Sequence, residues 1–481
     1  MLPELPFCKE STNFAADNLT RPHTLNMLFN SLGYLLFLPV VFLVYWLAMR
    51  TTRAKNLWII VASYFFYGWW DWRFTILLLL TTLASYATGL LIGRGWRPRL
   101  FLTLNILLNL GILCAFKYYD FFATSFCELA HVLGVGDFSP FMLRVVLPVG
   151  ISFYTFQALS YTVDVRRGHI AAERDFVAFA AYLCFFPQLV AGPIERATHL
   201  LPQMQAARTF DYAKAVDGMR RILWGLFKKV VIADGCAEGV NAIFADPALH
   251  SGSTLLMGAF LFSFQIYGDF SGYSDIAIGT ARLFGIHLTE NFRLPYFARD
   301  MRDFWRRWHI SLMTWLRDYV YIPLGGNRRG RRRTVINTFV VFGLSGLWHG
   351  ANWTFVLWGL YHALLLSLTP KGRRGNIVLT FLLVTLGWIL FRSASVTDAW
   401  EYLSLTVSHF SPTLPAYGKT MLPLIALMLV AEWLTRTETH PLSCLAARIS
   451  SPTLRMCLYW ALGVLILWHS GAATQFIYFQ F

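Results

Sequence analysis

Long apolar runs without charge constrain this chain more than any other feature of its sequence. Leu28–Ala48, Phe74–Ile92 and Leu100–Phe116 contain no Asp, Glu, Lys or Arg. Each run has the length of a helix that crosses a bilayer, about 20 residues. Only 14% of all residues are charged and 56% are hydrophobic, whereas soluble domains carry about 25% charge. The chain is therefore expected to be an integral membrane protein, which excludes a disordered chain and an ordinary cytosolic enzyme.

Further apolar runs extend this pattern along the chain. Those of spanning length are Val145–Val163, Phe176–Ile194, Trp353–Thr369 and Met456–Phe481. Shorter runs, which suit tilted, re-entrant or buried helices, are Leu57–Trp70, Thr254–Gly268, Val335–Leu347, Asn376–Phe391 and Thr420–Ala431. Together they predict an all-α polytopic bundle of roughly 11 membrane segments.

The distribution of basic residues predicts how the bundle is oriented. The net charge is +15, and cytoplasmic loops of membrane proteins collect Lys and Arg. Arg50, Arg53 and Lys55 follow the first run, and five arginines lie within 327–333. Asp120–Pro140 has three acidic residues and no Lys or Arg. These loops are expected to lie inside and outside respectively, with the N-terminus outside. A membrane explains the positive charge, and no nucleic-acid partner is expected.

Residues 1–26 are polar and lack the apolar core of a signal peptide. They are interpreted as a tail, or as the product of a start codon assigned upstream of Met27. Residues 27–481 show no internal repeat and are expected to form one integral domain.

The segment Arg293–Gly330 departs from the apolar pattern and is predicted to be helical after Asp303. At 100° per residue, one stripe of this helix comprises Trp305, Trp308, Leu312, Trp315, Leu316 and Tyr319. Arg302, Arg306 and Arg317 fall on the adjoining face, and His309 lies at the border. Two interpretations remain open. The segment is either an interfacial helix or part of a cytoplasmic cleft whose arginines hold a phosphate-bearing substrate.

A second histidine, His349, lies in the motif SGLWHGANW. Gly350 predicts a break after it, and Asn352 can cap a helix that begins at Trp353. His349 would then lie between two helices, either as a satisfied structural histidine or as a neutral general base. An ionisable side chain inside a membrane favours the functional interpretation. His362 is interpreted as structural, and His469 is expected at the membrane interface.

Two acids, Asp269 and Asp275, lie in the otherwise apolar stretch YGDFSGYSDIAIG. They could orient a histidine, pair with a basic residue or bind a cation, and the first two roles are favoured.

Five stretches resemble the membrane-bound O-acyltransferase family, in particular its bacterial alginate O-acetyltransferase branch. They are FFPQLVAGPI (185–194), YGDFSGYSDIAIG (267–279), DFWRRWHISLMTWLRDYVYIPLGG (303–326), GLWHGANWTFVLWGLYHA (346–363) and FIYFQF (476–481). The resemblance extends from about residue 27 to the C-terminus. Only residues 1–26 depart from the branch.

This resemblance implies a helical membrane bundle with a central tunnel that acyl-CoA enters from the cytoplasm. It implies that His349 is the catalytic residue and His309 its partner. Asp269, Asp275 and Asn352 are expected to support them. Substrate contacts are expected from Arg302, Arg306, Trp305, Trp308 and Trp348. In this branch the acyl group crosses the inner membrane, and a separate periplasmic transferase places it on an exopolysaccharide hydroxyl.

The sequence therefore predicts an O-acetyltransferase of the bacterial inner membrane that uses acetyl-CoA as donor, in contact with membrane lipid. No bound cofactor and no metal are expected, because the two histidines lack an evident third ligand. The alternatives are D-alanyl transfer towards teichoic acid, and acetylation of peptidoglycan or cellulose. A non-enzymatic exporter of lipid or polysaccharide is the alternative from another class of protein. The aromatic C-terminal run 476–481 is interpreted as a membrane anchor, or as a docking segment for the partner.

Overall fold

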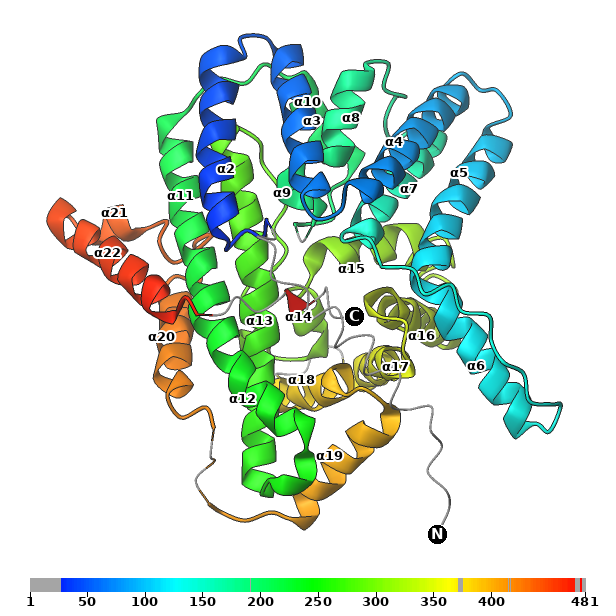
Figure 1. The fold of residues 1–481 in the computed structure, drawn as a ribbon, viewed down its shortest axis with the longest axis vertical. Helices are drawn as coiled ribbons and strands as arrows, with labels where there is room; N and C mark the ends of the chain where they lie inside the picture. Colours follow the sequence, from blue (N-terminus) through cyan, green and yellow to red (C-terminus); the bar gives the residue numbers. More distant parts are fainter. Residues whose placement is uncertain are drawn as a thin grey trace.

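The computed structural model describes residues 27–190, 192–370, 375–413, 415, 417–471 and 476–477. Over these residues the chain is helical and contains no β-strand, as Figure 1 shows, which confirms the predicted all-α class. The N-terminal tail 1–26 lies outside the described residues.

Most of the N-terminal helices form the upper part of the molecule in Figure 1, whereas Tyr119–Val132 extends to the lower right. They are α2 (Leu32–Leu43) with its π-helical continuation η1 (Val44–Ala48), α3 (Thr52–Gly68), α4 (Trp72–Gly93), α5 (Pro98–Leu113) with η2 (Cys114–Tyr118), α6 (Tyr119–Val132), α7 (Ile151–Arg167), α8 (Phe176–Cys184), α9 (Phe186–Leu189) and α10 (Ala197–Gln205). Two helical stretches here, Trp72–Gly93 and Pro98–Val132, are long and apolar enough to cross a membrane alone. The number of crossing segments remains a prediction.

Two long helical stretches form the centre of the fold. The first runs through α11 (Tyr212–Leu226), η3 (Phe227–Ala233) and α12 (Asp234–Ala245), and a short helix, η4 (Pro247–Leu249), follows it. The second is α13 (Gly252–Leu283), whose 32 residues span roughly 48 Å. The two stretches touch at their backbones, because a Cβ atom on Gly225 would lie 2.7 Å from the carbonyl oxygen of Gly272. Glycine is therefore needed at this crossing.

The remaining helices surround the lower part and one side of this pair. They are η5 (Pro295–Phe297), α14 (Met301–Trp305), α15 (Ile310–Leu316), η6 (Arg317–Tyr321), α16 (Gly330–His349), α17 (Trp353–Leu368), α18 (Ile377–Arg392), α19 (Val396–Ser408), α20 (Met421–Leu434), α21 (Leu445–Arg448) and α22 (Pro452–His469). Figure 1 shows α16 and α17 nearly end-on, between α15 and α18.

Three predicted segments differ from the structure, and each difference has a local cause. The run Phe176–Ile194 is not one helix. Helix α8 ends at Cys184, and Pro187 lies in the first turn of the separate helix α9, because proline cannot continue a preceding helix. The run Val145–Val163 becomes helical only at Ile151, after a left-handed Gly150. The predicted loop Asp120–Pro140 remains helical to Val132, because α6 continues directly from α5 through η2.

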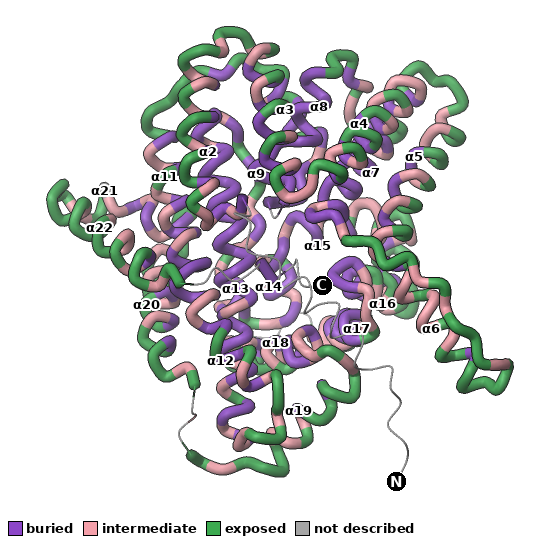
Figure 2. Tube along the Cα trace, in the orientation of Figure 1, coloured by how far each residue is buried: buried purple, intermediate pink, exposed green. Residues whose placement is uncertain are grey.

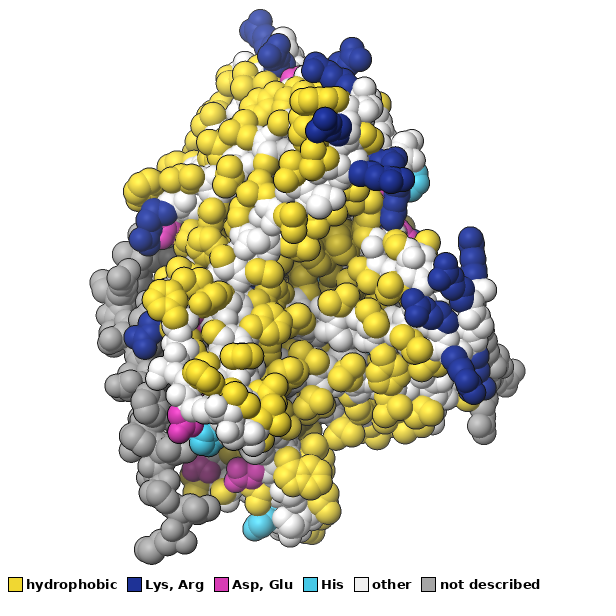
Figure 3. Space-filling model, turned by 90° about the vertical axis from the view of Figure 1, so that its right-hand side faces the viewer, with side chains coloured by type: hydrophobic (Ala, Val, Ile, Leu, Met, Phe, Trp, Pro, Cys, Tyr) yellow, Lys and Arg dark blue, Asp and Glu magenta, His cyan; other side chains and the backbone are white. Residues whose placement is uncertain are grey.

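The exposed apolar surface is that expected of a protein in contact with lipid. Buried residues follow the inner helices in Figure 2, whereas many residues on the outer helices are exposed. Exposed apolar side chains include Leu47, Trp400 and Trp468. Soluble proteins rarely expose large patches of apolar side chains. In Figure 3 the hydrophobic surface is extensive, and most Lys and Arg lie along the top and right edges. The membrane interpretation of the composition is thus consistent with the folded surface.

The two described residues of the C-terminal run do not fit a membrane anchor, which was one of the two interpretations of 476–481. Phe476 and Ile477 are buried in the protein, and the backbone N–H of Ile477 donates to Asp269 Oδ2 at 2.6 Å. The aromatic ring of Phe476 packs against Tyr273 with ring centroids 4.4 Å apart. These two residues therefore belong to the core around α13 and are not exposed to lipid. Residues 478–481 lie outside the described residues.

Candidate functional site

His349 is the last residue of α16. Gly350 is extended and ends the helix. Asn352 then caps α17, because its Oδ1 accepts the backbone N–H of Thr354 at 3.0 Å. The predicted break between two helices is therefore confirmed, and so is the cap. His349 is only 3% exposed, and its ring lies among those of Trp348, Trp358 and Phe391.

His309 lies in a break that was not predicted. The helix expected after Asp303 is interrupted between α14 and α15, where His309 has a left-handed φ of 44°. A non-glycine residue adopts this conformation at a cost that tertiary contacts must offset. The predicted separation of an aromatic-aliphatic stripe from an arginine face is confirmed, because Trp305, Trp308 and Leu312 are buried and Arg306 is exposed.

Asn291 supplies the contacts that hold His309. Its Oδ1 lies 3.0 Å from Nδ1 of His309 and accepts the hydroxyl of Ser311 at 2.9 Å. The backbone N–H of Ile310 donates to the carbonyl oxygen of Asn291 at 2.9 Å. Because Oδ1 is an acceptor, Nδ1 of His309 carries the proton, and Nε2 of a neutral ring can accept a hydrogen bond. Nε2 has no hydrogen-bond partner among the described residues.

The structure brings the two histidines together inside the protein. Their ring centroids are 6.1 Å apart, and the ring of Trp348 contacts both. His309 is 1% exposed. The pair therefore lies in a region of low dielectric, where a neutral imidazole is favoured over a charged one.

A large cavity with a positively charged lining lies beside α14, α15 and the first half of α16. We call it the basic cavity. It measures about 1170 Å³, and its charged lining residues are Arg302, Arg306, Arg317 and Arg331. No Asp or Glu lines it among the described residues. Trp305 and Phe342 form part of its wall, so an anion held by the arginines would adjoin an aromatic surface.

A second, smaller cavity reaches His349. We call it the His349 cavity. It measures about 190 Å³ and is lined by Trp70, Lys117, Val146, Leu147, Pro148, Val149, Gly150, Ile151, Ser152, Phe153, Val190, Trp348 and His349. Most of these residues are apolar, and Lys117 and His349 are the titratable groups in this lining.

Helix α16 has one of the two cavities at each of its ends. Its first residues, including Arg331, line the basic cavity, and its last residues, Trp348 and His349, line the His349 cavity. The helix has 20 residues, which span about 30 Å, the thickness of the hydrocarbon core of a bilayer.

Asp269 and Asp275 pair with basic residues and contact neither histidine among the described interactions. Asp269 lies 2.7 Å from Lys229. Asp275 lies 2.8 Å from Arg221 and 2.6 Å from Lys228. Of the roles considered from the sequence, the geometry places both acids in ion pairs.

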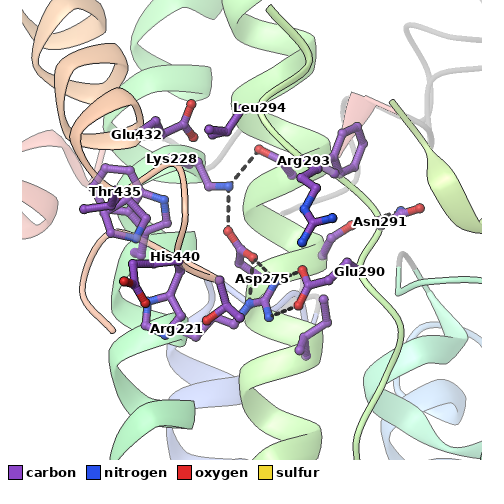
Figure 4. A pocket seen from close by; sticks show the side chains of 18 of the residues that line it. Arg221, Lys228, Asp275, Glu290, Asn291, Arg293, Leu294, Glu432, Thr435 and His440 are labelled. Atoms are coloured by element: carbon purple, nitrogen blue, oxygen red, sulfur yellow. Dashed lines mark hydrogen bonds and ion pairs between the residues drawn. The ribbon is translucent and has the colours of Figure 1, made fainter. Parts of the chain in front are cut away.

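The ion pairs of Asp275 reach the His309 site indirectly. Figure 4 shows Asp275 and Glu290 facing Arg221 from different segments, with Asn291 beside Glu290. Arg221 lies 2.6 Å from Glu290 Oε1. The buried guanidinium thus ties α11 and α13 to the segment that carries Asn291, and thereby supports the residue that holds His309.

The remaining predicted residues are placed as follows. Trp308 packs among Tyr267, Tyr296 and Trp388 and lines neither cavity. Trp348 lines the His349 cavity. His362 is fully buried, and neither of its ring nitrogens has a hydrogen-bond partner among the described residues.

Sequence reasoning missed Asn291 and Lys117. Asn291 follows no local motif that singles it out. Lys117 did carry a signal, because it is the only Lys, Arg, Asp or Glu within Leu100–Tyr119, and a charge in a membrane segment is a functional hypothesis by default.

The residues that the structure describes contain no group of three or more His, Cys, Asp or Glu that could hold a metal ion.

Comparisons with known proteins find a matching family and similar sequences. The model of the membrane-bound O-acyltransferase family matches residues 167–370, a range that contains both histidines. A probable alginate O-acetylase AlgI from Azotobacter vinelandii is 41% identical over 411 residues, which cover 82% of this chain and 81% of that protein.

Two proteins whose names state other activities are also similar to this chain. A peptidoglycan O-acetyltransferase from Helicobacter pylori is 33% identical over 479 residues, covering 90% of this chain and 88% of that protein. A teichoic acid D-alanyltransferase from Bacillus subtilis is 29% identical over 270 residues, covering 50% of this chain and 68% of that protein.

Proposed function

This chain belongs to the membrane-bound O-acyltransferase family and is an acyltransferase, and we propose that it takes acetyl from cytoplasmic acetyl-CoA and passes it across the bacterial inner membrane. The final acceptor is an exopolysaccharide such as alginate, and a separate periplasmic transferase places the acetyl group on it. One observation carries this proposal. A single helix, α16, has an arginine-lined cavity at its start and His349, in a second cavity, at its end.

The basic cavity would bind the donor from the cytoplasm. Arg302 and Arg306 lie in its wall, and the arginines of 328–333 belong to the segment that is predicted to face the cytoplasm. Arginine makes charge-assisted hydrogen bonds to phosphate oxygens, and the positive field would raise the local concentration of an anionic donor. Trp305 would then contact the uncharged part of the donor that extends towards the histidines.

His349 would act as general base on the acceptor hydroxyl. As the hydroxyl oxygen attacks the thioester carbonyl carbon, its proton passes to the imidazole. The tetrahedral intermediate collapses with cleavage of the carbon–sulfur bond, and the sulfur of CoA takes the proton from the imidazolium. Atoms and charges balance without a further reactant.

His309 would hold the acceptor molecule through a hydrogen-bond donor other than the attacking hydroxyl, because the single proton of that hydroxyl passes to His349. Its Nδ1 faces Asn291, so the neutral ring offers Nε2 as an acceptor. Fixing the acceptor fits that tautomer, whereas donating to the thioester carbonyl oxygen would need a protonated ring. Holding both reactants in one narrow site would contribute to the rate as much as the base does.

Other acyl donors and polymers give two alternative functions. D-alanyl transfer would use a carrier-protein thioester, whose phosphopantetheine would fit the same basic cavity; the similarity to the teichoic acid D-alanyltransferase covers half of the chain. Acetylation of peptidoglycan would keep the donor and change only the downstream partner, and the similarity to the peptidoglycan O-acetyltransferase supports it. The exporter is not retained, because the family transfers acyl groups.

The test uses detergent-purified protein with labelled acetyl-CoA, and measures donor binding, free CoA and the transferred label. Binding with turnover that requires His349 would support the proposal. Absence of acetyl-CoA binding would contradict it, and a D-alanyl carrier-protein thioester would then be tested as donor in the same assay.

A further inference from the structure

Lys117 is a half-buried lysine that the proposed mechanism does not use. It lies in η2 (Cys114–Tyr118), within the long apolar stretch Pro98–Val132. Its ammonium donates to the carbonyl oxygen of Trp348 at 2.7 Å and to that of His349 at 3.0 Å. These two carbonyls belong to the last turn of α16, where an α-helix has no N–H groups left to pair with them.

The contact joins two segments that are far apart in sequence at the position of the proposed base. Lys117 and His349 both line the His349 cavity. A lysine ammonium has three N–H donors, and two of them hold the end of α16. The helix end carries partial negative charge, which a cation stabilises, and the apolar surroundings strengthen that attraction.

A lysine in an apolar stretch is expensive to place in a membrane. Packing alone would be satisfied by Met or Leu, which carry no desolvation cost. The position therefore calls for a donor, and what it binds is the backbone of the residue whose imidazole must meet two substrates. Small displacements of such a group cost large factors in rate.

We propose that Lys117 is a positioning residue for acyl transfer, which holds the last two carbonyls of α16 and so fixes His349 at the wall of the His349 cavity. This inference rests on the proposed function of His349. It separates two tasks, since the basic cavity binds the donor and Lys117 sets the geometry of the transfer step.

The test replaces Lys117 and then adds a small amine that corresponds to the atoms removed from the side chain. Lys117→Ala removes three methylene groups and the ammonium, which together correspond to n-propylamine. Membranes of a deletion strain of the native bacterium, carrying each variant, receive radiolabelled acetyl-CoA, and base-labile acetyl ester is counted. Purified protein reports the Kd for acetyl-CoA. We expect label transfer to fall at least 30-fold, with the Kd within twofold of the parent protein.

Propylamine should restore at least a tenth of the lost activity of Lys117→Ala, whereas 1-propanol, of similar size and uncharged, should not. Lys117→Met, which fills the space without an ammonium, should be inactive and should not respond to propylamine. Lys55→Ala is the matched control, because Lys55 is a buried lysine that also donates to a backbone carbonyl, that of Arg208 at 2.8 Å, but lies away from both histidines. It should retain activity within threefold and show no amine response.

Three results would overturn the inference. The first is Lys117→Ala activity within threefold of the parent. The second is a loss that propylamine does not restore although acetyl-CoA still binds. The third is a parallel loss of transfer and of acetyl-CoA binding in both Lys117→Ala and Lys117→Met, which would make Lys117 a residue of the fold. Failure of the proposed function is distinct, because the parent protein itself would then neither bind acetyl-CoA nor transfer its label.

Discussion

Nδ1 of His309 lies 3.0 Å from Oδ1 of Asn291, and this one contact settles which nitrogen of the histidine is available to a substrate. The same Oδ1 also accepts hydrogen bonds from the backbone N–H and the hydroxyl of Ser311. The amide orientation is thus fixed by three donors. The left-handed conformation of His309 and the direction of its ring follow from a residue 18 positions earlier in the chain.

Asn291→Ala is therefore expected to lower kcat by about 100-fold, because a misplaced reactive group costs factors of that order. It should also destabilise the protein by about 1–3 kcal/mol, because buried donors lose their acceptor. Steady-state kinetics and thermal unfolding of the purified variant measure both. Asn109→Ala is the matched control, since Asn109 is also buried but donates within α5. A normal kcat in Asn291→Ala would show that His309 does not depend on this contact.

His349→Ala should reduce acetyl transfer by at least about 100-fold, the lower range for loss of a general base, while acetyl-CoA binding changes little. His362→Phe tests the structural interpretation of the neighbouring histidine. His362 is packed among aromatic rings, so a phenyl ring should keep the activity within a few-fold. A loss in His362→Phe as large as that in His349→Ala would contradict the structural interpretation of His362.

Replacing Arg302 and Arg306 together by Gln should raise the KM for acetyl-CoA about 10- to 100-fold and leave kcat nearly unchanged. Each arginine would lose a charge-assisted hydrogen bond worth about 1.5–3 kcal/mol, partly screened where the side chain is exposed. The parent KM should rise with ionic strength, and that of the variant should rise less. Arg99→Gln, which removes an exposed charge in the first turn of α5, is the control. A fall in kcat at constant KM would remove these arginines from donor binding.

Two glycines on α16 should respond in opposite ways to alanine. A Cβ atom on Gly346 would lie 2.1 Å from the carbonyl oxygen of Phe355, so Gly346→Ala must push α17 away. We expect loss of stability and of activity, because His349 lies three residues further on. On Gly343 the nearest atom to a Cβ would be 3.6 Å away, and alanine there should stabilise the helix by up to about 1 kcal/mol. Thermal unfolding of both variants checks the pair, and a tolerated Gly346→Ala would contradict the close packing of α16 on α17.

His199 should make stability depend on pH. It lies on α10, beyond the apolar runs, and its Nδ1 lies 2.7 Å from Glu195. The hydrogen bond to Glu195 raises the pKa of His199 above its usual value, against the opposing effect of burial. The stabilisation is therefore complete below the unfolded-state pKa, about 6.5, and is lost as the pH rises through the folded-state pKa. The difference in Tm between the parent protein and His199→Asn should shrink over that range. A difference that grows with pH would refute the assigned direction.

Local signals in the sequence were enough to predict the surroundings of His349. The helix end at His349, the glycine that follows it and the capping Asn352 lie within four consecutive residues. Local rules for helix ends and caps apply over such a short distance. The aromatic stripe around Trp305 was also correct as a statement about burial, because hydrophobic side chains segregate whether or not the helix is continuous.

The break at His309 could not be predicted in the same way. No glycine or proline marks it, and its energy is offset by contacts with Asn291 across the fold. The break at Pro187 is different, because a proline inside a predicted helix is a local signal for a break. The prediction of a single span was based on the length of the apolar run alone. The partners of Asp269 and Asp275 depend on how η3 lies against α13, which periodicity alone does not reveal.

The buried ion pairs between η3 and α13 bear on how the protein is made. Lys228 and Lys229 reside on one helical stretch, and Asp269 and Asp275 on the next. A charged side chain alone in a helix entering the bilayer costs about 2.5–3.5 kcal/mol during insertion. Lys229 has a partner on its own stretch, Asp234 at 2.7 Å, but Lys228 would enter lipid uncompensated if that stretch left the insertion machinery first. The partner of Lys228, Asp275, arrives only when α13 has been synthesised, so the two stretches are best delivered to the membrane together, as one hairpin.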